Sequence, residues 1–163
     1  MPSEARGKAG RPSTGRNKAE RPRDHLGRPQ AWDAPNSLTL EDYDALALEE
    51  NHRLGREHFN AGRFFPAHEA WEAAWKQARG SGDEEFFKGL SQLGAGYTHL
   101  LRGNAHGAAT LMRRASGRIR RYPPGRHGVA TATVADRADA HAAGVDEGSL
   151  VPGQGPPADT PVV

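Results

Sequence analysis

The sequence predicts an all-α protein: one small up-and-down bundle of about five helices with disordered N- and C-terminal tails. Between residues 38 and 143, apolar residues recur at the three- and four-residue spacing of helices, and no stretch alternates as a strand does. Glycine and proline interrupt this pattern at short intervals, so the connections are short. Consecutive helices with short connections pack roughly antiparallel, which is the reason for expecting an up-and-down bundle.

The first two predicted helices meet at a tight corner. The first lies within residues 40–60, and Thr39 with an acidic residue three positions later indicates its start. Gly62 can adopt the positive φ that ends a helix. Pro66 favours the first turn of the second helix, 66–79, because proline has no N–H to lose there.

The remaining helices are predicted from capping and stop residues. The third begins after Asp83, which can cap it, and runs to Leu101 before a glycine. Asn104 then caps a fourth helix over residues 105–121, which ends before two prolines. A weaker fifth helix is expected over residues 133–143.

Both terminal segments lack the apolar residues that a folded core needs. Residues 1–37 carry eight basic and four acidic side chains, a net charge of +4, among many prolines and glycines. Residues 144–163 are also rich in proline and glycine, without a period. Such segments bury too little apolar surface to offset their ordering entropy, so we expect both to be disordered. The helical domain is therefore predicted over residues 38–143.

The composition excludes several classes of protein. The chain has no cysteine, so it can form neither disulfides nor thiolate metal sites and has no thiol nucleophile. No apolar run approaches the length of a membrane span, and the N-terminus lacks the apolar stretch of a secretory signal. We therefore expect a cytoplasmic protein with no membrane partner.

The second predicted helix holds a cluster of metal-ligating residue types. His68 and Glu72 are four residues apart and share one face, at the margin of an apolar stripe. A histidine and a carboxylate placed in this way can reach one ion, and His99 on the facing helix would complete a set of three ligands. One interpretation of this cluster is therefore a divalent metal ion bound by His68, Glu72 and His99, with Glu69 as an outer carboxylate.

The third predicted helix has two glycines on its apolar side, Gly89 and Gly96. Glycine weakens a helix, so a close approach by a neighbouring helix is the expected compensation, with Trp71 and Trp75 filling the groove. This packing would form a pocket between the second and third helices. The predicted ligand-binding residues of the pocket are His68, Glu69, Glu72, Trp75, Gln92, Tyr97, His99 and Asn104.

The order of these motifs resembles the family known as domain of unknown function 309. The resemblance covers roughly residues 46–121. It rests on the runs Phe59-Asn60-x-Gly62-x-x-Phe65-x-Ala67-His68-Glu69-x-Trp71-Glu72-x-x-Trp75, Gly89-Leu90-x-Gln92-Leu93-x-Ala95-x-Tyr97-x-His99 and Arg102-Gly103-Asn104-x-x-Gly107-Ala108. It implies a small all-helical bundle without an established activity. The resemblance thus supports the fold and leaves open whether the protein is an enzyme.

Three other interpretations stand beside the metal site. His68 and Glu72 can instead pair with each other as a structural device, and Glu69 can favour the positive end of the helix dipole. The first helical hairpin is similar to one tetratricopeptide unit, a scaffold for protein partners, although no second copy follows. Residues 1–37 can make a weak, salt-dependent contact with nucleic acid, and six arginines between residues 113 and 126 add positive charge.

Overall fold

The computed structural model describes residues 22–35 and 37–163, and in this part of the chain all regular secondary structure is helical. Five α-helices make up the bundle: α1 (Leu48–Asn60), α2 (Phe64–Gln77), α3 (Glu84–Leu101), α4 (Ala105–Ile119) and α5 (Thr131–Glu147). Two short 3-10 helices accompany them: η2 (Tyr43–Ala45) and η3 (Arg126–Gly128). The predicted all-α class is confirmed. None of the helices in these two ranges is long and apolar enough to cross a membrane.

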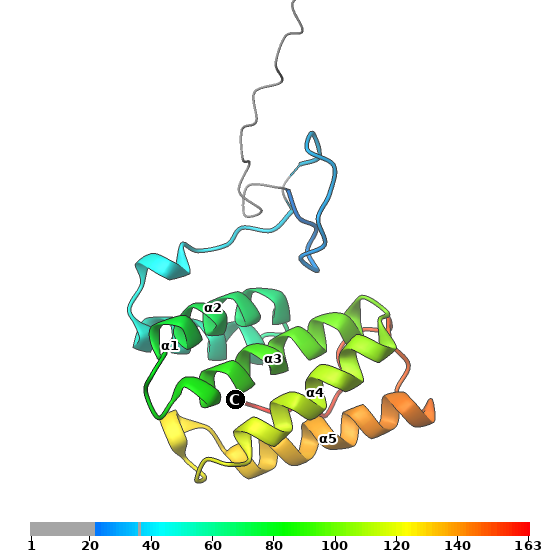
Figure 1. Cartoon of the computed structure of the whole chain (residues 1–163). Helices are drawn as coiled ribbons and strands as arrows, with labels where there is room; N and C mark the ends of the chain where they lie inside the picture. The colour runs from blue at the N-terminus through cyan, green and yellow to red at the C-terminus, as the bar shows by residue number, and fades with distance from the viewer. Residues whose placement is uncertain (1–21, 36) are drawn as a thin grey trace, which may run out of the picture.

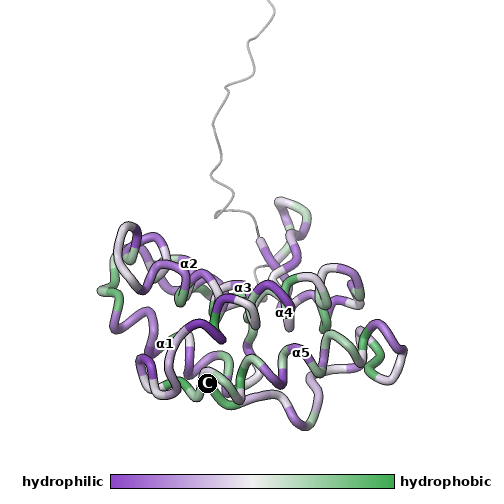
Figure 2. The backbone as a smooth tube through the Cα atoms, turned by 60° about the horizontal axis from the view of Figure 1, so that its bottom comes forward, coloured by the Kyte–Doolittle hydropathy of each residue, from purple (hydrophilic) through white to green (hydrophobic). Residues whose placement is uncertain are grey.

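Each helix packs mainly against the next one along the chain, which gives the up-and-down arrangement of Figure 1. Each helix carries both hydrophobic and hydrophilic residues (Figure 2). At helical spacing, the hydrophobic residues of a helix gather on the face that packs in the core. The core between the helices is rich in aromatic rings. Phe59, Trp71, Phe86, Phe87 and Tyr97 are all fully or almost fully buried in it.

The start of α1 differs from the sequence prediction. A helix was expected from residue 40, but α1 begins at Leu48, after η2. The reason is that Tyr43 is buried against α2, and Asn51 Nδ2 donates to the carbonyl of Tyr43 at 2.8 Å. This side-chain hydrogen bond stabilises a turn that a continuous helix could not form.

The two glycines of α3 approach a different helix from the one expected. A Cβ on Gly96 would lie 3.0 Å from Cγ of Met112, and one on Gly89 would lie 3.0 Å from the side chain of Ile119. Both contacts are to α4, so Trp71 and Trp75 of α2 do not fill this groove. The close contact between α3 and α2 occurs at Gly94, where a Cβ would lie 2.9 Å from the backbone nitrogen of His68.

The C-terminal residues pack on the bundle, in contrast to the disordered tail expected from residue 144. Helix α5 continues to Glu147, and the chain then runs back across the bundle (Figure 1). Gly153 N donates to the carbonyl of Leu100 at 2.8 Å. The backbone N–H and C=O of Val163 both bond the side-chain amide of Asn60, at 2.9 and 2.8 Å. Hydrogen bonds of this kind have no sequence period, which is why the pattern predicted disorder.

Part of the predicted N-terminal tail also lies on the bundle, while residues 1–21 fall outside the described residues. Residues 22–30 form a turn in which Asp24 Oδ1 accepts from the backbone N–H groups of Leu26 and Arg28. The turn contacts α3, because Arg102 donates from Nε and Nη2 to the carbonyl of Leu26, at 3.1 and 2.9 Å. The described end of this segment is therefore part of the folded protein.

Candidate functional site

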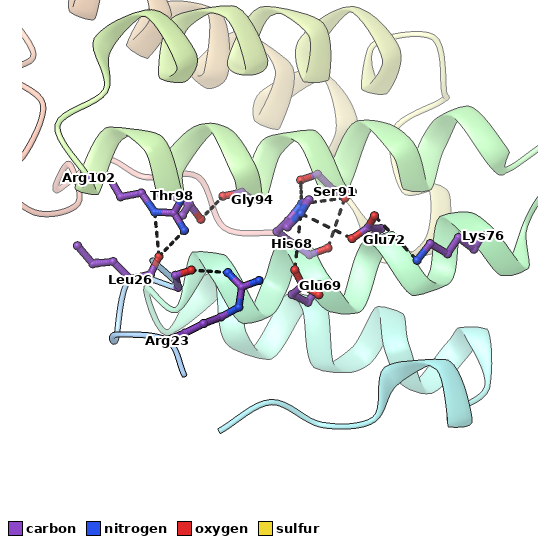
Figure 3. Close-up of polar contacts among 11 residues, drawn as sticks. Arg23, Leu26, His68, Glu69, Glu72, Lys76, Ser91, Gly94, Thr98 and Arg102 are labelled. Carbon is purple, nitrogen blue, oxygen red and sulfur yellow. Dashed lines mark hydrogen bonds and ion pairs between the residues drawn. The ribbon is translucent and has the colours of Figure 1, made fainter. Parts of the chain in front are cut away.

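His68 lies on α2 where α2 passes closest to α3, opposite Gly94. Its Nδ1 is 2.9 Å from the carbonyl oxygen of Ser91 and 3.0 Å from the Ser91 hydroxyl, as Figure 3 shows. The hydroxyl itself donates to the carbonyl of His68 at 3.3 Å. Because a carbonyl only accepts, this network assigns the proton of a neutral His68 to Nδ1 and leaves a lone pair on Nε2.

Two carboxylates face this lone pair. His68 Nε2 lies 4.0 Å from Oε1 of Glu69 and 3.8 Å from Oε2 of Glu72 (Figure 3). Both distances are too long for a hydrogen bond. One ligand atom from each of the three residues lies within 4.8 Å of the others, and the three side chains are 25, 31 and 34% exposed. The cluster is therefore partly shielded from water, and its groups face one another across a gap.

Two of the three distances across the gap fit a metal site with three protein ligands. Two ligand atoms that are each ~2.1 Å from an ion lie at most ~4.2 Å apart. The distances from His68 Nε2 to the two carboxylates are within that limit. The ligand atoms of Glu69 and Glu72 lie within 4.8 Å of each other.

The electrostatics of the cluster favour a cation. Burial raises the pKa of Glu69 above its ordinary value; the neighbouring His68 opposes this rise and Glu72 adds to it. Two carboxylates held close together in a partly buried site repel each other. Lys76 Nζ forms an ion pair with Oε1 of Glu72 at 3.9 Å, and the charges of Arg23 and Lys76 partly oppose the rise in the pKa of Glu69. A bound cation would remove the repulsion.

Two cavities flank the cluster, one on each side. A cavity of about 350 Å³ separates Glu69 and Glu72 from the η2 segment, where Glu41, Asp42 and Asp44 also line it. A smaller cavity of about 90 Å³ lies on the other side of His68. The acidic cavity offers a route by which a cation would reach the cluster.

One protein-family model matches the part of the chain that holds this site. The family model described as "Domain of unknown function (DUF309)" matches residues 52–111. This segment of the chain is similar to the DUF309 family. The match confirms the family resemblance, and the matched residues include the whole His68 cluster with Ser91 and Gly94. No curated protein and no solved structure matches the chain.

His99 lies near the His68 cluster of the DUF309 segment but is not one of its three members. It lines the 90 Å³ cavity together with His68. Asn104 holds the His99 ring in this position. Its Oδ1 accepts a hydrogen bond from the N–H of Gly107 at 3.0 Å. The Nδ2 of Asn104 can therefore donate to His99 Nδ1, also at 3.0 Å. Asn104 is thus the predicted helix cap, and the structure groups Glu69, instead of His99, with His68 and Glu72.

The other predicted residues of the DUF309 segment point elsewhere. Gln92 accepts a hydrogen bond from Arg118 of α4 at 3.2 Å. The Tyr97 hydroxyl lies 2.6 Å from His141 Nδ1, deep between α3 and α5. Trp75 is partly buried, with Nζ of Lys88 5.0 Å from its ring centroid. These side chains support the bundle and do not converge on the cluster.

Sequence reasoning missed two supports of the site. Ser91 is buried and orients the His68 ring, and Gly94 permits the close approach of α2. The signal available in the sequence was the helical spacing of Ser91 and Gly94, which are three residues apart and share a face. It gave no reason to prefer this face of α3 over the face with Gly89 and Gly96.

The predicted cluster of arginines near the end of α4 is largely paired with carboxylates. Four of its six members bond acidic side chains of neighbouring elements. The pairs are Arg113 with Asp146, Arg118 with Glu85, Arg120 with Asp136 and Asp139, and Arg126 with Asp83. Much of the positive charge expected to attract nucleic acid is therefore neutralised within the fold.

Proposed function

We propose that this protein binds a divalent metal ion, such as Zn²⁺ or Mn²⁺, through His68, Glu69 and Glu72. The single observation that carries the proposal is the gap at His68 Nε2, which faces two carboxylates at 3.8 and 4.0 Å. One imidazole nitrogen and two carboxylate oxygens form a donor set that suits such ions. Glu69 takes the place in this set that the sequence pattern assigned to His99.

The support around His68 is typical of a metal ligand. Metal-binding histidines usually donate their second ring N–H to a carbonyl or carboxylate, which fixes the tautomer and the ring orientation. His68 makes this bond to the carbonyl of Ser91. In the neutral ring, the Nε2 lone pair faces two carboxylates without a hydrogen bond and is available to a cation.

Three protein ligands leave coordination positions open for water or substrate. An ion bound in this way polarises a carbonyl or phosphoryl oxygen and lowers the pKa of bound water. We therefore propose a site capable of metal-assisted hydrolysis. The carboxylates that line the adjacent cavity, Glu41, Asp42 and Asp44, would draw the cation toward the cluster.

The test is calorimetric titration of metal-free protein with zinc chloride and with manganese chloride. The proposal predicts one ion per chain, and an affinity lowered about 100-fold or more by His68→Ala. His106→Ala is the matched control, because His106 is an exposed histidine on α4. Equal binding by wild type and His68→Ala, or no binding of either ion, would refute the proposal.

A further inference from the structure

A second cavity, separate from the His68 cluster, lies between the N-terminal segment and the corner of α1 and α2. Its volume is about 360 Å³, which is within the range of small-molecule pockets. Its walls are mainly apolar and come from the N-terminal segment, the start of α2 and the end of α3. The apolar side chains are those of Leu26, Leu38, Phe64, Phe65, Pro66 and Leu101.

The polar residues of this cavity give it a definite charge preference. They are His25, Ser37, Arg63 and Thr98, so the lining holds basic and hydroxyl groups and no carboxylate. His25 and Arg63 are exposed, whereas Phe64 and Phe65 are buried. The cavity is therefore apolar inside and basic where it meets water. This character is opposite to that of the acidic cavity beside Glu69 and Glu72.

The wall formed by the N-terminal segment is held in place by several contacts around Phe65. Gly27 packs directly on the ring, since a Cβ at this position would lie 2.3 Å from Phe65 Cγ. The guanidinium groups of Arg23 and Arg102 lie 5.0 and 5.6 Å from the ring centroid. Arg102 also bonds the carbonyl of Leu26. These contacts make the cavity a part of the fold.

We propose that this cavity binds a small apolar carboxylic acid. The hydrocarbon part lies between Leu38, Phe64 and Leu101, and the carboxylate lies toward His25 and the terminal nitrogens of Arg63, whose Nε donates to His58 Nδ1 at 2.9 Å. A carboxylate bonded by a guanidinium forms one of the stronger hydrogen-bonded pairs in proteins. An apolar cavity with a basic rim and no acidic lining discriminates against an amine of the same length. The proposal is independent of the metal site, because none of the three proposed metal ligands lines this cavity.

Calorimetric titration of the full chain with sodium octanoate tests this proposal, with EDTA present to exclude any metal–carboxylate contact. Octylamine and octan-1-ol serve as probes of equal length. We expect octanoate to bind at one site and the amine to bind at least about tenfold more weakly. Arg63→Gln should weaken octanoate binding about tenfold, as expected for loss of one charge-assisted hydrogen bond. Equal binding of all three probes, or no binding of octanoate, would overturn the proposal.

Two variants locate the bound molecule. Leu101→Trp and Leu38→Trp each fill the cavity from a different wall, so both should abolish binding even if one of them perturbs the fold. Val151→Trp is the matched control, because Val151 is exposed and does not line the cavity. Helix content and melting temperature are measured for all three variants. Octanoate binding that survives in a folded cavity-filling variant would contradict the assignment.

Discussion

His68 and His141 have similar neighbours but opposite geometry. Each imidazole lies near a hydroxyl group and at least one carboxylate. Both ring nitrogens of His141 are at hydrogen-bond distance, with Nδ1 2.6 Å from the Tyr97 hydroxyl and Nε2 2.8 Å from Asp159 Oδ1. His68 Nδ1 is also at hydrogen-bond distance, as a donor to the Ser91 carbonyl, but its Nε2 lies 3.8 and 4.0 Å from its two carboxylates. Residue types alone therefore do not distinguish a structural histidine from a candidate ligand, whereas the distances do.

The two histidines also differ in what depends on them. His141 is only 6% exposed and joins α3, α5 and the C-terminal segment through Tyr97 and Asp159. Arg137 strengthens the connection by bonding the second oxygen of Asp159 at 2.6 Å. The His68 side chain is 25% exposed and lies beside two cavities. A saturated, buried network stabilises the fold, and an unsaturated, accessible one is available to a ligand.

The largest predicted effect is the loss of stability caused by His141→Ala. This change leaves the buried Tyr97 hydroxyl without its partner and creates a cavity, so the free energy of unfolding should fall by about 3 kcal/mol. Urea denaturation measures this difference. Tyr97→Phe should cost less, about 1 to 2 kcal/mol, because it removes one hydroxyl and little volume. If His141→Ala lowered the free energy of unfolding by less than about 0.5 kcal/mol, His141 would not be a structural histidine, and it would not differ from His68 in this respect.

Gly94→Ala should have the next largest effect. The new methyl group would lie 2.9 Å from the His68 backbone nitrogen, so α2 and α3 must separate, at a cost of about 2 kcal/mol. Gly117→Ala is the matched control on α4, since open space surrounds a Cβ there and alanine favours the helix. Urea melts should therefore move in opposite directions for the two variants. Equal shifts would show that the close approach at His68 does not constrain the bundle.

A third histidine, His52, should have a smaller effect on the free energy of unfolding, and this effect depends on pH. His52 Nδ1 accepts from Trp71 Nε1 at 3.1 Å, so its Nε2–H donates to the carbonyl of His127, and the ring is neutral. Burial lowers the pKa of His52 below the ordinary value of 6.5, because the charged form loses hydration. As the pH falls, His52 is therefore protonated at a higher pH in the unfolded chain than in the folded protein. Stability due to His52 is complete above pH 6.5 and decreases as the pH falls from there toward the lowered pKa of the folded state.

The slope of this decrease is at most about 1.4 kcal/mol per pH unit for one proton. Urea melts between pH 7.5 and about 5 measure it in the wild type and in His52→Gln. The variant should have the lower stability at pH 7.5 and the smaller slope below pH 6.5. An unchanged slope in the variant would assign the pH dependence to other groups and not to His52.

The smallest predicted effect on stability is that of His68→Ala in metal-free protein. The ring is partly exposed and its Nε2 makes no hydrogen bond, so the free energy of unfolding should fall by no more than about 1 kcal/mol. The same urea melts as for His141→Ala measure it. A loss of about 3 kcal/mol would instead mark His68 as a structural residue.

Local signals in the sequence predicted much of the fold. Asp83 and a glycine marked the ends of α3, and Asn104 and two prolines marked those of α4, to within a few residues. The separation of His68 and Glu72 by four residues also predicted that they share one face of α2. These features depend on neighbours in the sequence, so a single chain contains enough information to predict them.

The rotation of α3 about its axis could not be predicted in the same way. Helical spacing alone does not decide whether Gly94 or the pair Gly89 and Gly96 faces α2, and this choice decides whether His99 joins the cluster. The course of the C-terminal segment could not be predicted either, because it depends on individual hydrogen bonds such as those between Asn60 and Val163. Contacts between distant residues without a repeating pattern leave little signal in one sequence.

The most direct test of the contrast between the two histidines is the unfolding free energy with and without zinc. We predict that zinc at about 100 times its dissociation constant stabilises the wild type by about 2.7 kcal/mol. The same addition should stabilise His106→Ala equally and His68→Ala by no more than about 0.4 kcal/mol. Equal stabilisation of wild type and His68→Ala, or none in any of the three proteins, would contradict a metal site at His68, Glu69 and Glu72.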